Sequence, residues 1–116
     1  PWLAVNPNYV KINVEEALAN PDSIFYTYQK LVNIRKENSW LVRADFELLD
    51  TAGKVFAYIR KDGDRRFLVV ANLSNEEQDL AVEGNVKSVL IENTAVQEVF
   101  EKQSLAPWDA FCVELG

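Results

Sequence analysis

The chain has 116 residues, of which 48% are hydrophobic and 26% charged, and its formal net charge is −6. This length suits a globular fold with a real core and leaves little room for two full domains. The acidic balance excludes nucleic acid and anionic membrane as expected partners, because neither phosphates nor lipid headgroups would be neutralised. No apolar run approaches the roughly 20 residues that cross a bilayer.

Three residue counts narrow the chemistry further. The chain contains no histidine, which excludes Ser-His and Cys-His nucleophile pairs, imidazole bases and histidine metal ligands. We therefore expect neither a metal ion nor a cofactor. The single cysteine, Cys112, cannot form an internal disulfide, and a reducing, cytoplasmic setting is expected. There is no methionine either, so we expect the chain to be a piece of a longer polypeptide.

The sequence pattern of the first third of the chain predicts helices. Residues 1–9, PWLAVNPNY, have no periodicity and should be irregular. Asn13 is placed to cap a short helix over residues 14–18, and Asn20 followed by Pro21 predicts the start of a long helix that ends near residue 37. Its apolar stripe has the three- and four-residue spacing of an amphipathic helix and consists of Ile24, Tyr28, Leu31, Val32 and Arg35.

From residue 41 the hydrophobic period changes to two, which predicts strands. They are expected at residues 41–49, 55–60, 67–73, 80–82, 86–91, 96–100 and 107–115. The strongest local signal is the Asp62-Gly63 pair between two apolar runs, which predicts a hairpin. About seven short strands after one long helix predict a mostly β fold, an antiparallel β-sandwich.

The strand at residues 67–73 is apolar on both faces. Leu68 and Val70 point to one side, whereas Phe67, Val69, Ala71 and Leu73 point to the other. A strand with one wet face would alternate with polar residues, so each side should be covered. We expect a companion sheet on one side and the long helix on the other.

Three stretches, taken in order, resemble one protein family. They are PWLAVNPNY, the helix tail YQKLVNIRKENSWL, and the run FAYIR…RFLVVANLSNEE…LAPWDAFCVEL. They are similar to the C-terminal end of alpha-amylase-family glycoside hydrolases, in the branch of oligo-1,6-glucosidase, glucan 1,6-alpha-glucosidase and trehalose-6-phosphate hydrolase. Trp108 and Asp109 stand where relatives often have tyrosine and glutamate.

The resemblance implies a division into residues 1–38, the end of a catalytic barrel with its last helix, and residues 39–116, a C-terminal β-sandwich. The family's three catalytic carboxylates and nearby histidines precede this segment, so no catalytic residue is expected here. The fragment itself would be inactive, and the parent enzyme would be a retaining alpha-glucosidase that acts on alpha-1,6-linked or related short glucosides. The expected partner is the missing N-terminal barrel of the same polypeptide, which the sandwich would stabilise.

Trp2, Asn6 and Asn8 are the candidate substrate-binding residues. Loops after barrel strands build the active sites of such enzymes, so Trp2 could stack on a sugar and either asparagine could bind its hydroxyls. The alternative is a rigid connector whose prolines and asparagines satisfy its own backbone.

A second function remains open, an alpha-glucan-binding module whose surface aromatics are Trp40, Tyr58 and Trp108. Packing in the core or at a domain junction is the other role for these three side chains. Cys112, between Phe111 and Val113, should be a small buried apolar residue. An apolar patch left by the absent barrel could also make the fragment a homodimer.

Overall fold

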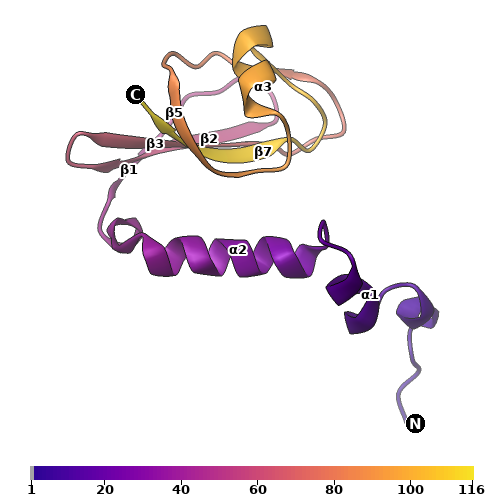
Figure 1. Cartoon of the computed structure of the whole chain (residues 1–116). Helices are drawn as coiled ribbons and strands as arrows, with labels where there is room; N and C mark the ends of the chain where they lie inside the picture. Colours follow the sequence, from indigo (N-terminus) through magenta and orange to yellow (C-terminus); the bar gives the residue numbers. More distant parts are fainter. Residues whose placement is uncertain (1) are drawn as a thin grey trace. The chain divides into compact units, whose positions relative to one another are not determined.

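A computed structural model describes residues 2–116 of the chain. The chain forms two compact units, Pro1–Glu37 and Asn38–Gly116. The first unit holds the 3-10 helix η1 (Pro7–Val10) and the α-helices α1 (Val14–Ala19) and α2 (Ile24–Glu37), labelled in part in Figure 1.

Asparagine side chains begin both short helices of the first unit. Asn13 Oδ1 accepts from the Glu16 N–H at 2.9 Å, which confirms the predicted cap of α1. Asn6 Oδ1 accepts from the Asn8 N–H at 2.9 Å and so caps η1, with Pro7 at the first helical position. The prediction of an irregular stretch over residues 1–9 was therefore wrong at its end, where a helical turn forms.

The long helix starts three residues later than Pro21 predicts. Asn20 Oδ1 accepts from the Asp22 N–H at 3.0 Å, which closes a side-chain turn in place of a helix cap. The first helical bonds instead run from Tyr26 and Thr27 to the Ser23 carbonyl. The hydroxyl groups of Ser23 and Tyr26 donate back to the carbonyls of Ala17 and Leu18, so α1 and α2 are tied together.

The second unit is built on a five-stranded antiparallel sheet with the strand order β1-β2-β3-β7-β5. A separate two-stranded sheet pairs β4 with β6. In chain order the elements are η2 (Ser39–Val42), β1 (Asp45–Leu48), β2 (Val55–Asp62), β3 (Arg65–Asn72), β4 (Gln78–Asp79), β5 (Val86–Glu92), α3 (Val96–Lys102), β6 (Ser104–Leu105) and β7 (Ala110–Leu115). Every strand pair among residues 2–116 is antiparallel, which confirms the predicted mostly β class.

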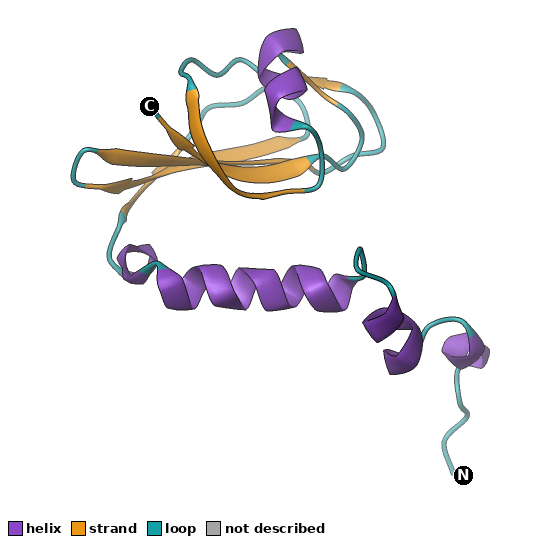
Figure 2. Ribbon diagram, viewed as in Figure 1, coloured by secondary structure: helices purple, strands orange, loops and turns teal. Residues whose placement is uncertain are grey.

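One face of the large sheet carries the main hydrophobic cluster. Leu68 and Val70 of β3 are fully buried there, and α3 lies over this face, as Figure 2 shows. The remaining buried side chains of the cluster come from the neighbouring strands, from α3 and from the β4–β6 region; they are Val55, Ala57, Ile59, Leu80, Val96, Val99, Leu105, Phe111, Val113 and Leu115. The predicted cover on this side of the hairpin is thus confirmed, although the companion sheet has only two short strands.

Residues 96–100, predicted as a strand, form the helix α3 instead. Val96 and Val99 are buried and Phe100 is half-buried, which is the spacing of a helix and not of a strand. The Glu92 carboxylate accepts from the Val96 N–H at 3.2 Å and satisfies one free donor at the start of α3. The prediction of a strand at residues 80–82 was also wrong, since the pairing lies at Gln78–Asp79.

The hairpin between β2 and β3 is confirmed, with a two-residue loop of Gly63 and Asp64. Asp62 pairs with Arg65, and Gly63 has φ +61°, whereas the φ of Asp64 is not positive. A positive φ at the first loop position alone is the pattern of a type II′ turn, for which glycine is the favoured residue. The register of all eight residue pairs of the hairpin follows from this turn.

Candidate functional site

The predicted substrate-binding residues lie in the first unit. Trp2 is almost fully exposed, at 94%. The Asn6 side chain is engaged in the cap of η1, and the Asn8 carbonyl accepts from the N–H groups of Lys11 and Ile12. The backbone contacts match the rigid-connector alternative for Asn6 and Asn8. A sugar-binding role of the three residues in a complete enzyme stays a prediction.

The acidic side chains of residues 2–116 form no metal-binding group. Over residues 2–116 no cluster of three or more Cys, Asp or Glu side chains could hold a metal ion. The two buried carboxylates, Asp109 and Glu114, are each engaged by donors of the chain itself. Over the same residues no helix is both long and apolar enough to cross a membrane.

The most unusual surface of the second unit is the side of the large sheet opposite the core. We call it the outer face and define it by nine side chains without charge: Phe46, Leu48, Phe56, Tyr58, Val69, Ala71, Ile91, Ala110 and Cys112. One row crosses all five strands, because Leu48 pairs with Tyr58, Tyr58 with Val69, Val69 with Cys112 and Cys112 with Ile91. Phe46, Leu48 and Phe56 are exposed and the other six are half-buried.

Aromatic rings hold the β1–β2 side of the outer face together. The ring centroids of Phe46 and Tyr58 lie 5.0 Å apart, and those of Phe56 and Tyr58 lie 5.5 Å apart. Burial raises the pKa of the Tyr58 hydroxyl above its ordinary value. The outer face therefore offers an apolar surface with a single hydroxyl, that of Tyr58, in its ring cluster.

One end of the sheet next to the outer face is already covered. Trp40 of η2 is buried and stacks on Phe67, with ring centroids 3.7 Å apart. The Arg65 guanidinium lies 4.8 Å from the centre of the same Phe67 ring. The Arg60 guanidinium donates to the carbonyls of Leu41 and Ala44 at 2.8 Å, which fastens η2 to the sheet. Residues 38–44 are thus a built part of the second unit.

Glu114 of β7 lies opposite Phe67 in the strand register. Its carboxylate links β7 to β3 and β5 through side-chain bonds. Arg65 donates to both of its oxygens at 3.0 and 3.1 Å, and Lys87 donates to one of them at 3.1 Å. These bonds, those from Arg65 first, lower the pKa of Glu114 to about 2 against the opposing effect of burial. Glu114 is a structural carboxylate with no free oxygen for general acid–base work.

A buried polar latch, missed by the sequence analysis, closes the core side at the end of β3. The Asn72 amide donates to the carbonyls of Glu76 and Ala106 at 2.7 and 3.0 Å, and its oxygen accepts from the N–H and hydroxyl of Ser74. Asn72 and Ser74 are 2% and 4% exposed, so every one of these bonds replaces water. The available signal was the Asn72-Leu73-Ser74 sequence directly after an apolar run, where a polar pair must be satisfied locally.

Cys112 is half-buried in the row that crosses the outer face. Burial raises the pKa of its thiol to about 11, so the thiol is protonated and unreactive near neutral pH. This agrees with the predicted role as a small apolar residue.

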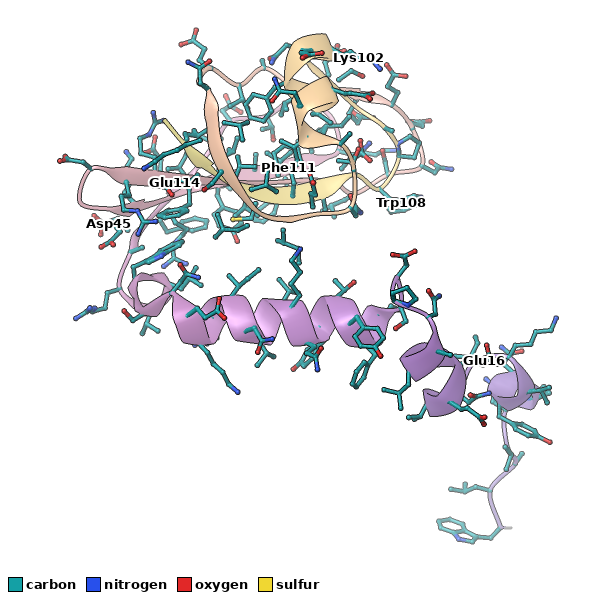
Figure 3. The ribbon with its side chains drawn as sticks, viewed as in Figure 1. Glu16, Asp45, Lys102, Trp108, Phe111 and Glu114 are labelled. Carbon is teal, nitrogen blue, oxygen red and sulfur yellow. The ribbon has the colours of Figure 1, made fainter. Side chains whose placement is uncertain are left out.

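The three aromatic residues proposed as a sugar platform do not share one exposed surface. Trp40 is 7% exposed and its ring N–H donates to Asn38 Oδ1 at 3.0 Å, so the packing alternative is confirmed for Trp40 and the exposed sugar contact is excluded. Tyr58 is half-buried between Phe46 and Phe56. Trp108 alone is largely exposed, at 61%, and lies in the loop before β7 (Figure 3).

Two family models match the chain and meet near its unit boundary. Residues 1–44 match the alpha amylase catalytic domain, and residues 46–112 match the maltogenic amylase C-terminal domain. The chain belongs to the maltogenic amylase C-terminal domain family and represents the C-terminal part of an alpha-amylase-family glycoside hydrolase.

Relatives with this arrangement include two streptococcal proteins. A glucan 1,6-alpha-glucosidase of Streptococcus pneumoniae serotype 4 is 90% identical over 115 residues, which are 99% of this chain and 22% of the relative. A glucan 1,6-alpha-glucosidase of Streptococcus dysgalactiae subsp. equisimilis is 55% identical over 115 residues, 99% of this chain and 21% of the relative. The chain thus spans about a fifth of the length of these relatives.

Among solved structures, the trehalose-6-phosphate hydrolase of Bacillus licheniformis matches with a TM-score of 0.84 and 34% identity. The match covers 100% of this chain and 22% of that chain. An isomaltulose synthase of Klebsiella sp. LX3 matches with a TM-score of 0.84 at 29% identity, again over 100% of this chain and 22% of that one. The chain covers the C-terminal domain of alpha-glucosidase-family enzymes, as the resemblance implied.

Proposed function

We propose that this chain is a non-catalytic β-domain whose outer face packs against the catalytic domain of the same polypeptide and stabilises it. The observation that carries the proposal is the outer face itself, a row of uncharged side chains that crosses all five strands. An antiparallel sheet with one face in water normally alternates apolar with polar side chains. Here the second face is also apolar, and a contiguous apolar surface of this kind marks a docking site.

The catalytic domain is the occupant that we assign to the outer face. The family match of residues 1–44 to an alpha-amylase catalytic domain supports it, because that domain would be present in any longer polypeptide of this family. The nine side chains that define the outer face carry no charge, and the charged Arg60 and Glu114 on the same side of the sheet are bound by groups of this chain, which suits permanent burial against another domain better than a transient encounter with a soluble partner. A second copy of the chain is the occupant expected only when the catalytic domain is absent.

The names of the relatives support an assignment of the whole enzyme as an alpha-glucosidase that hydrolyses alpha-1,6-linked or related short alpha-glucosides. Retaining hydrolysis needs an acid and a nucleophile about 5–5.5 Å apart. In this proposal the catalytic domain supplies both groups, and the carboxylates of this chain serve the structure. The cytoplasmic location remains a prediction from composition.

The test uses a composite enzyme, defined as the pneumococcal relative with its matching residues replaced by this chain. Leu48→Lys places a charge in the row of the outer face at a side chain that is 60% exposed in this chain. We expect the thermal inactivation midpoint of the composite enzyme to fall by several degrees, with kcat and KM on nitrophenyl alpha-glucoside unchanged below that temperature.

The matched control is Gln97→Lys, which adds the same charge at an exposed position on α3. It should leave the midpoint of the composite enzyme unchanged. Equal midpoints for Leu48→Lys, Gln97→Lys and the unsubstituted composite enzyme would refute the proposed function.

The alternative function, an alpha-glucan-binding module, retains support from one residue. Trp108 is the largely exposed member of the proposed platform, whereas Trp40 is buried. A sugar platform normally presents an open aromatic face together with polar groups that fix its hydroxyls. The nine side chains that define the outer face are uncharged and include one hydroxyl, that of Tyr58, so a protein partner is the better-supported occupant.

A further inference from the structure

Trp108 has a backbone conformation that tryptophan normally avoids. Its φ is +64°, in the left-handed region, where a side chain with a Cβ crowds the following carbonyl. The Asp109 N–H donates to the Ala106 carbonyl at 3.2 Å, so residues 106–109 form a tight turn with Pro107 and Trp108 at its centre. Proline followed by a residue of positive φ is the pattern of a type II turn, in which glycine or asparagine is favoured at the position of Trp108.

The surrounding bonds hold this strained turn rigidly. The Trp108 N–H donates to the Ser74 carbonyl at 3.1 Å, and its own carbonyl accepts from the Asn93 side chain at 2.9 Å. The Asp109 carboxylate accepts from the Ala106 N–H at 2.8 Å and closes the turn from the opposite end. A conformation that persists against its own strain must be over-determined by its neighbours, and such strain concentrates at functional positions.

The chain buries little of this tryptophan. The side chain is 61% exposed, and the neighbouring Leu73 is 62% exposed. Figure 3 shows Trp108 at the end of the sheet on the side away from α3, which is the side of the outer face. The first residue of β7, Ala110, belongs to the outer face, so the loop that carries Trp108 leads directly onto it.

We propose that Trp108 is an anchor residue of the interface with the catalytic domain, held in advance in the conformation that the contact requires. This inference rests on the proposed function of the outer face and adds Trp108 to the residues of that interface. Interface energy is concentrated in a few large side chains, with tryptophan the most enriched among them. A side chain fixed before docking loses less conformational freedom on binding.

Trp108→Gly tests the proposal because its effect should change sign between two proteins. In the 116-residue chain, glycine relieves the left-handed strain without loss of a buried contact, so the thermal midpoint should rise by about 4 °C. In the composite enzyme the same substitution removes the anchor, and the midpoint should fall by about 4 °C.

Gln103→Gly is the matched control, since Gln103 also has a left-handed φ, of +50°, but follows α3 on the core side of the sheet. Its effect on the midpoint should have the same sign and size in both proteins. A Trp108→Gly effect that is likewise the same in both proteins would overturn the anchor role. If Leu48→Lys still lowered the midpoint of the composite enzyme, the proposed function would survive that failure.

The competing role of Trp108 is to bind a sugar, and one titration distinguishes this role from that of an interface anchor. Isomaltotriose is added to the 116-residue chain while tryptophan fluorescence is recorded. The proposal predicts no saturable change. A saturable change that disappears in Trp108→Gly would replace the anchor role by a saccharide-binding role.

Discussion

The two faces of the five-stranded sheet have similar residues and opposite environments. On β3, Leu68 and Val70 are fully buried under α3 and the short β4–β6 sheet, whereas their neighbours Val69 and Ala71 on the outer face are half-buried. Sequence pattern alone cannot separate the two faces, because both sides of the strand are apolar. The difference teaches that the second unit, Asn38–Gly116, covers one face of its sheet completely and covers the other at one end, where Trp40 stacks on Phe67.

The largest expected effect compares a core leucine with an outer-face leucine. Leu68→Ala leaves a cavity under α3 and should lower the free energy of unfolding of the 116-residue chain by about 3 kcal/mol. Leu48→Ala removes an exposed side chain and should change it by no more than about 0.5 kcal/mol. Urea unfolding followed by tryptophan fluorescence measures both, and equal losses would remove the distinction between the two faces.

The next effect concerns the polar edge of the core face. Asn72→Leu keeps the side-chain size but strips partners from buried carbonyls and from the Ser74 N–H, so it should destabilise the chain by about 2–3 kcal/mol. Asn75→Leu, at an exposed loop position, is the control and should fall within about 0.5 kcal/mol of the original chain. A small loss for Asn72→Leu would mean that the latch is not a source of stability.

The third effect concerns the ion pairs of Glu114 with Arg65 and Lys87. Glu114→Gln should cost about 1–2 kcal/mol at pH 7, because Arg65 and Lys87 are themselves partly exposed. The pKa of Glu114 is lowered in the folded state from 4.5 to about 2, so its contribution is complete above pH 4.5 and is lost as the pH falls toward 2.

The difference in unfolding free energy between the original chain and Glu114→Gln should therefore shrink across that pH interval. Glu98→Gln, from the exposed pair with Lys102 on α3, is the control and should show little difference at any pH. A Glu114 difference that stays constant from pH 7 to pH 3 would contradict the assigned ion pairs.

The smallest effect lies in the turn between β2 and β3, which belongs to neither face. Gly63 has φ +61°, and a Cβ at this position would have no other atom within 4 Å. The only cost of Gly63→Ala is therefore backbone strain. We expect a loss of about 1 kcal/mol in urea unfolding. A gain in stability would show that the hairpin adopts a turn other than the one described.

The sequence predicted the hairpin, the cap at Asn13 and the mostly β class correctly because each has a local cause. It failed at α3, where a short run of Val96, Val99 and Phe100 fits strand and helix alike, and tertiary packing on the core decides between them. It also failed at Asn20 and Pro21, where a side-chain turn competes with a helix start.

For the site, sequence reasoning left open whether Trp40 packs in the core or binds sugar, because its burial depends on Phe67, 27 positions along the chain. The sequence predicts only part of the backbone strain at Trp108. Proline at position 107 is compatible with a turn, but the positive φ of the following residue depends on Ser74 and Asn93, which are distant in sequence. Long-range contacts of this kind leave no local pattern.

The most direct test of the account uses two adjacent valines that differ only in the face they occupy. Val69→Thr and Val70→Thr each place a hydroxyl on β3 without a change of shape, and thermal stability is measured in the 116-residue chain and in the composite enzyme. Val70→Thr should lower the free energy of unfolding by about 1–2 kcal/mol in both proteins, since Val70 is fully buried in the core. Val69→Thr should cost less than about 0.5 kcal/mol in the chain alone and about 1 kcal/mol or more in the composite enzyme, where we propose that the catalytic domain covers it. A Val69→Thr effect of the same small size in both proteins would contradict the assignment of the outer face as a domain interface.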